Sequence, residues 1–159
     1  MMNFFLSPPA NRNGLLVCIF SFLGFTIALN GLIFGLGFND NPTVVGEGIL
    51  PPGYVIGGVW TLLFIAMAWA YWRVASDEGN KAGNHYHILA FAGFCLAYPL
   101  FTLGFSQPLM VILGNVICIV WSGALFGYFI TRQRQAALLL LLPAIWVIYV
   151  TCQLMLGLL

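Results

Sequence analysis

The chain has 159 residues, of which 62% are hydrophobic and only 6% are charged, and its mean hydropathy is +1.00. Soluble domains carry about 25% charged residues, so this composition indicates an integral membrane protein. The formal net charge is +1 and the five basic residues form no cluster, which argues against nucleic acid as a partner.

Five apolar segments are long enough to cross a bilayer as helices, which takes about 20 residues each. The first exceeds the apolar region of a signal peptide, so we expect it to be a membrane helix. The predicted helices cover residues 15–37, 53–74, 87–106, 109–131 and 136–158. No internal repeat or change of composition divides the chain. The sequence therefore predicts an all-α membrane protein, a five-transmembrane-helix bundle forming one domain over residues 1–159.

The second predicted helix follows the longest connection, residues 38–52, and begins after a double proline. It ends on Trp69, Tyr71 and Trp72 beside Arg73. Aromatic rings and a basic side chain at a helix end are typical of the membrane interface, so we expect these aromatic residues to be interfacial anchors.

The basic residues predict an orientation. With five spans, all of them fall on the side of the N-terminus, and these residues are Arg12, Arg73, Lys81, Arg132 and Arg134. Basic residues in short loops favour the cytoplasm. We therefore expect a multi-pass protein with its N-terminus in the cytoplasm and its C-terminus outside.

Glycines four residues apart let helices approach closely in lipid. Three such pairs lie within predicted helices: Gly31 with Gly35, Gly53 with Gly57, and Gly123 with Gly127. They predict close packing inside the bundle, with a homodimer interface as the alternative.

Apart from Arg73 and His87 at span ends, the predicted spans contain no Asp, Glu, Lys, Arg or His, so ion coupling is not expected. We expect the polar residues within them to form hydrogen bonds between helices. These residues are Thr26, Asn30, Thr61, Thr102, Asn115, Ser122, Thr151 and Gln153.

The sequence predicts no metal site and no catalytic site. Its four cysteines, Cys18, Cys95, Cys118 and Cys152, fall in different segments without a CxxC pair, and we interpret them as small buried hydrophobic residues. We place His85 and His87 in a juxtamembrane loop. An uncharged interior with many aromatic rings suits a flat, apolar ligand, although ordinary packing explains the same composition.

Several stretches resemble one family. Residues 51–70, PPGYVIGGVWTLLFIAMAWA, are similar to the second helix of the TspO/MBR family, the tryptophan-rich sensory proteins related to the mitochondrial translocator protein. Tyr98 and Pro99 resemble the end of its third helix. Pro143 and Trp146 resemble its fifth helix.

This resemblance implies a receptor or sensor in the bacterial cell membrane that binds a porphyrin, haem or sterol-like molecule within the helix bundle, beneath the 38–52 connection as a lid. The resemblance requires no cofactor, and it implies membrane lipid as a further partner. A transporter of tetrapyrroles or lipids is the alternative, followed by a porphyrin-degrading enzyme. Carried over by position, the ligand-binding residues are Tyr54, Ile56, Gly57, Trp60, Tyr98, Trp146, Val150 and Gln153.

The chain departs from the family pattern at informative positions. Ile49 stands where the family has a tryptophan before the double proline, and Cys95 stands where it has an asparagine. Porphyrin degradation in relatives is attributed to tryptophans, and this chain has isoleucine at position 49. A porphyrin-degrading enzyme is therefore the last of the alternatives.

Overall fold

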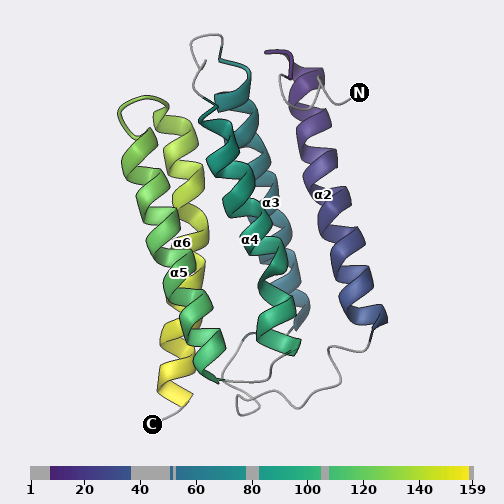
Figure 1. Ribbon diagram of the computed structural model, residues 1–159, viewed down its shortest axis with the longest axis vertical. Coiled ribbons are helices and arrows are strands. Elements are labelled where there is room, and N and C mark those ends of the chain that lie inside the picture. The colour runs from purple at the N-terminus through teal and green to yellow at the C-terminus, as the bar shows by residue number, and fades with distance from the viewer. Residues whose placement is uncertain (1–7, 37–50, 52, 78–82, 105–107, 158–159) are drawn as a thin grey trace.

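The protein is a bundle of five α-helices (Figure 1). The computed structural model describes residues 8–36, 51, 53–77, 83–104 and 108–157. Consecutive helices run in opposite directions, so the N-terminal end of the first and the C-terminal end of the last lie at opposite ends of the bundle (Figure 1). The helices are α2 (Arg12–Gly35), α3 (Gly53–Ala75), α4 (His85–Gly104), α5 (Pro108–Phe129) and α6 (Arg134–Gly157).

These bounds confirm the five predicted helices to within three residues at each end. Four of them, α2, α3, α5 and α6, are long and apolar enough to cross a membrane by length and composition, within the described part of the chain. The predicted placement of His85 and His87 in a loop is wrong, because α4 begins at His85 and so includes both histidines. The proposed lid, residues 38–52, lies outside the described residues except for Pro51.

The arginines of the described chain gather at one end of the bundle. Arg12 begins α2, Arg73 lies in the last turn of α3, Arg132 lies between α5 and α6, and Arg134 begins α6. We call this half of the bundle the arginine half. The distal half is the other one, and it comprises residues 27–35 of α2, 54–62 of α3, 96–104 of α4, 108–117 of α5 and 146–157 of α6.

Buried side chains concentrate in the arginine half. None of residues 54–62 of α3 is buried, whereas eight of the twelve residues from Leu63 to Val74 are. Helix α2 shows the same change: its buried residues recur every fourth position from Gly14 to Thr26, and none follows between 27 and 32. The pair α5 and α6 is the exception, since it has the most extensive contact of any helix pair described.

A short arm fixes the start of α2. The Asn11 side chain accepts a hydrogen bond from the Gly14 amide at 2.9 Å, as a helix N-cap does. The indole of Trp72 donates to the Pro9 carbonyl at 3.0 Å and so ties this arm to the end of α3. Gly14 is needed here, because a Cβ at this position would lie 2.1 Å from the Pro9 oxygen.

Three predictions about side chains are corrected by the packing. Tyr71 is not an interfacial anchor, since it is fully buried and its ring packs 5.8 Å from that of Phe22. Cys152 is exposed, whereas the other three cysteines are buried as expected. The glycine pairs do not pack closely: a Cβ at Gly31, Gly35, Gly57, Gly123 or Gly127 would meet no atom within 4 Å.

Candidate functional site

The four candidate residues of α3 lie in the first turns of that helix, in the distal half. Ile56 and Trp60 are one helical turn apart and therefore share a face, and both are partly buried. Gly57 and Tyr54 lie on a neighbouring face and are exposed, Tyr54 to 82%. The structure thus turns Trp60 and Ile56 inward and leaves Tyr54 on the outside of the described bundle.

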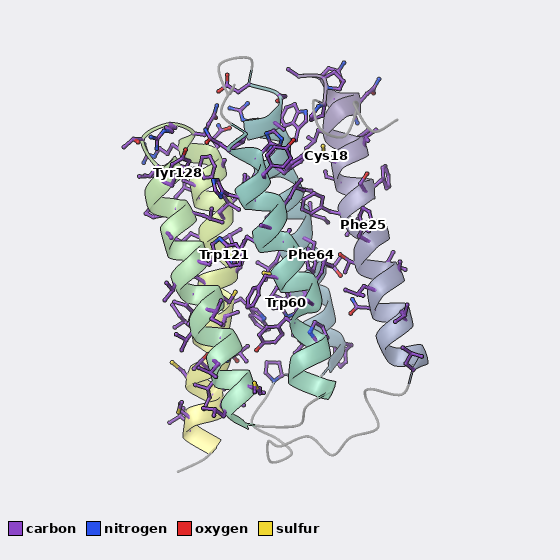
Figure 2. The ribbon with its side chains drawn as sticks, in the orientation of Figure 1. Cys18, Phe25, Trp60, Phe64, Trp121 and Tyr128 are labelled. Carbon is purple, nitrogen blue, oxygen red and sulfur yellow. The ribbon has the colours of Figure 1, made fainter. Side chains whose placement is uncertain are left out.

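Trp60 joins α3 to α4 by ring contacts. Its indole lies 5.9 Å from the Tyr98 ring, centroid to centroid, and also 5.9 Å from the ring of Phe64 one turn further along α3. In Figure 2, Trp60 lies further from the arginine end than Phe64. The contact with Tyr98 brings together two residues that are far apart in the sequence, and both had been predicted to line the site.

A chain of hydrogen bonds continues from Tyr98 across two more helices. The Tyr98 hydroxyl donates to the side-chain oxygen of Asn115 on α5. The Asn115 amide donates to the Thr151 hydroxyl on α6 at 2.9 Å, and that hydroxyl donates to the Val147 carbonyl at 2.7 Å. Asn115 is fully buried, so these bonds satisfy an amide that would otherwise be costly in an apolar interior.

The three candidate residues of α6 share one face of that helix. Trp146, Val150 and Gln153 follow one another at helical spacing and are all partly buried. The Trp146 ring lies 5.5 Å from that of Tyr149 on the same helix. Among the described contacts, Thr151 of α6 is linked to Tyr98 through Asn115.

Asn115 and Thr151 are functional candidates that the sequence had assigned only to packing. Their predicted role in hydrogen bonds between helices is confirmed, as it is for Ser122, whose hydroxyl donates to the Leu140 carbonyl. What the sequence could not supply was the helix register that places Asn115 beside Tyr98. The available signal was an amide within an otherwise apolar span, because such residues are uncommon in membrane helices.

Pro143 and Ser122 both affect backbone hydrogen bonding of α6 beside this region. Pro143 is buried inside α6 and has no N–H, so the Leu139 carbonyl four residues earlier has no helical donor from it. The neighbouring Leu140 carbonyl accepts a hydrogen bond from the Ser122 hydroxyl of α5. This bond joins α5 to α6 close to the proline.

The described residues include no group of three or more His, Cys, Asp or Glu that could hold a metal ion. His85 lies at the arginine end, where its ring packs 5.8 Å from Tyr71 and 4.2 Å from Tyr86. Burial of its ring lowers the pKa of His85 below the ordinary value. The Nε2 atom of His85 has no hydrogen-bond partner among the described residues.

Comparison with known proteins agrees with a membrane protein built from these helices. The family model described as the TspO/MBR family matches residues 44–155, which is more than half of the chain. Searches of curated proteins and of solved structures gave no match. The matched region contains Trp60, Tyr98, Asn115 and Thr151, which come from four different helices. The chain belongs to the TspO/MBR family.

Proposed function

We propose that this protein binds a flat, apolar ligand, such as a porphyrin, haem or a sterol-like molecule, in the distal half of its bundle. Family membership and the membrane-spanning helices support a membrane protein of sensor or transporter type. The ligand would lie against Trp60 and Tyr98, and Trp146 of α6 would be a further contact.

The single observation that carries this proposal is the change in burial along α3. From Tyr54 to Leu62 no side chain is buried, although eight of the twelve side chains from Leu63 to Val74 of the same helix are buried. Apolar and aromatic side chains that the protein itself does not cover are available to another apolar molecule. Trp60 stands at this boundary, partly buried and in ring contact with Tyr98.

The polar chain supports the same location. Ligand sites are mostly apolar with a small number of placed polar groups, which set the orientation of the ligand. Tyr98 and Asn115 provide such groups beside the Trp60 ring, and their hydrogen bonds hold three helices in fixed register. The distal half holds no described Asp, Glu, Lys, Arg or His, so the acidic groups of a porphyrin would point toward the membrane surface.

Titration of the purified protein in lipid nanodiscs with protoporphyrin IX, haem and cholesterol tests this proposal through quenching of tryptophan fluorescence. Trp60→Ala removes an aromatic face from the site, and we expect a loss of affinity of about tenfold, equivalent to about 1.4 kcal/mol. Trp69→Ala is the matched control, because Trp69 lies on the same helix in the arginine half and is exposed. Equal affinities for the two variants would exclude a site at Trp60.

Vesicles that contain the protein separate binding from transport. If the protein only binds porphyrin, porphyrin added outside the vesicles should reach serum albumin trapped inside them no faster than in protein-free vesicles. A saturable increase in flux that Trp60→Ala reduces would instead assign this site to a transporter.

We propose that the arginine half faces the cytoplasm and that the distal half lies toward the outside of a bacterial cell membrane, because basic residues are retained on the cytoplasmic side. Single cysteines introduced in a Cys152→Ala background test this with an impermeant maleimide. Tyr54→Cys should react in intact cells and Gln135→Cys only after the cells are opened, since both positions are exposed at opposite ends of the bundle. The reverse pattern would place the distal half in the cytoplasm.

A further inference from the structure

Two of the four cysteines face each other in the middle of the bundle. Cys95 lies on α4 and Cys118 on α5, and both side chains belong to the same cluster of buried core residues. Cys95 is 2% exposed and Cys118 is fully buried. Both are free thiols, so the structure holds a reduced pair shielded from water.

The register of α4 and α5 independently places these cysteines together. The two helices are antiparallel, and the Tyr98 hydroxyl is bonded to Asn115 across them. Cys95 lies three residues before Tyr98, and Cys118 lies three residues after Asn115, so both lie about one turn closer to the arginine end. A further turn along, the rings of Phe91 and Trp121 are 5.8 Å apart. Contacts on both sides therefore hold the two thiols opposite each other.

We propose that Cys95 and Cys118 are an oxidisable pair that reduces a membrane-soluble organic hydroperoxide and forms a disulfide between α4 and α5. One sulfur attacks the outer peroxide oxygen, the O–O bond breaks, and the alkoxide leaves as an alcohol with the proton of the first thiol. The second thiol then displaces water from the sulfenic acid. Two thiols are oxidised by two electrons, and one hydroperoxide is reduced to one alcohol and one water.

Burial selects the class of oxidant. Both side chains lie between helices inside the bundle, so an oxidant must pass through an apolar interior to reach them, which favours an apolar hydroperoxide over hydrogen peroxide. Thiols and disulfide are both uncharged, so neither end state leaves a charge in the apolar interior. Glutathione is likewise excluded, and a disulfide formed here would persist until a membrane-permeable reductant reached it.

The sequence offers a direct assay, because Met110 lies between the two cysteines. Cyanogen bromide cleaves after methionine, which places Cys95 in fragment 68–110 and Cys118 in fragment 111–155. The full-length Cys152→Ala protein leaves Cys118 as the sole cysteine of its fragment. After treatment in nanodiscs with cumene hydroperoxide, non-reducing mass spectrometry should find the two fragments joined, and a permeable phosphine should separate them.

Two controls make the result decisive. Adding Cys118→Ala, or Cys95→Ala in a second protein, must abolish the joined product, and an equal concentration of hydrogen peroxide must give less of it. Cys18 reports non-specific pairing, because it lies in a third fragment, residues 3–67. Fragments that stay separate after cumene hydroperoxide treatment, in protein whose circular dichroism shows intact helices, would overturn the proposal. Oxidation of Cys95 to a sulfinic acid without joining would overturn it as well.

Discussion

The two halves of the bundle are built from similar apolar residues but are packed differently. In the arginine half, α3 buries most of its side chains, and fully buried aromatic residues such as Tyr71, Phe91 and Phe129 fill the space between helices. In the distal half, the same helix buries none of residues 54–62, and a chain of polar side chains links α4, α5 and α6.

This difference suggests that the arginine half stabilises the bundle and that the distal half recognises the ligand. Helices in a membrane are held together by close packing and by hydrogen bonds rather than by exclusion of water, so the well-packed arginine half should supply most of the stability. The distal half relies on few directional bonds, and its uncovered apolar surface is suited to a ligand. A site can then vary in the distal half without unfolding the bundle.

Truncation of the packed core is the strongest test of this division. Phe91→Ala removes a fully buried ring that contacts Trp121 at 5.8 Å, and we expect a loss of about 3 kcal/mol of unfolding free energy. Ile56→Ala is the matched change in the distal half and should cost less than about 1 kcal/mol, because Ile56 is only partly buried. Unfolding by sodium dodecyl sulfate in mixed micelles measures both. Similar losses in the two variants would contradict the division.

The arm at the arginine end gives a smaller effect. Gly14→Ala places a Cβ 2.1 Å from the Pro9 oxygen, so the arm must move and its bond to Trp72 is lost. We expect a loss of about 1–3 kcal/mol in the same unfolding assay, as for other overpacked sites. Gly24→Ala on the same helix meets no atom within 4 Å and should be neutral or stabilising by at most about 1 kcal/mol. If both variants behave alike, the arm does not contribute to packing.

The number and extent of the helices could be predicted from the sequence because they depend on local properties. Span length follows from bilayer thickness, and apolar runs bounded by Pro51, Arg73 or Arg132 show where helices stop. The cap at Asn11 was missed, so the predicted start of the first helix was three residues late.

The faces of these helices could not be predicted, because each helix is apolar all round. In a soluble helix the polar face identifies the side that is exposed to water, but no such contrast exists when lipid is the solvent. Tyr71 and Trp69 therefore looked alike in sequence, yet one is fully buried and the other is exposed. The same reason explains why the glycine pairs were misassigned and why Asn115 was not connected to Tyr98. Of the candidate site, the family resemblance supplied the positions, and the structure supplied the contacts between them.

The hydrogen bonds of the distal half predict a modest coupling. A double-mutant cycle with Tyr98→Phe and Asn115→Ala should give a coupling free energy of about 0.6–1.7 kcal/mol, the range for such bonds within membranes. Tyr86→Phe with Asn115→Ala is the control cycle, since Tyr86 is exposed at the other end of α4 and should give no coupling. A zero value for both cycles would mean that the bond between Tyr98 and Asn115 does not hold the helices together.

The smallest expected effect is a pH dependence confined to the arginine half. Burial lowers the pKa of His85, and among the described residues the rings of Tyr71 and Tyr86 pack against it. The unfolded chain therefore binds more protons at His85 than the folded protein does near the ordinary histidine value of about 6.5. Stability is complete above that pH and decreases as the pH falls toward the lowered value in the folded protein. The unfolding temperature should be lower at pH 5.5 than at pH 7.5, and His85→Phe should reduce this difference by retaining a packed ring without a proton site. His87→Phe serves as the control because His87 is exposed. If only His87→Phe reduces the pH dependence, the dependence comes from His87 and not from His85.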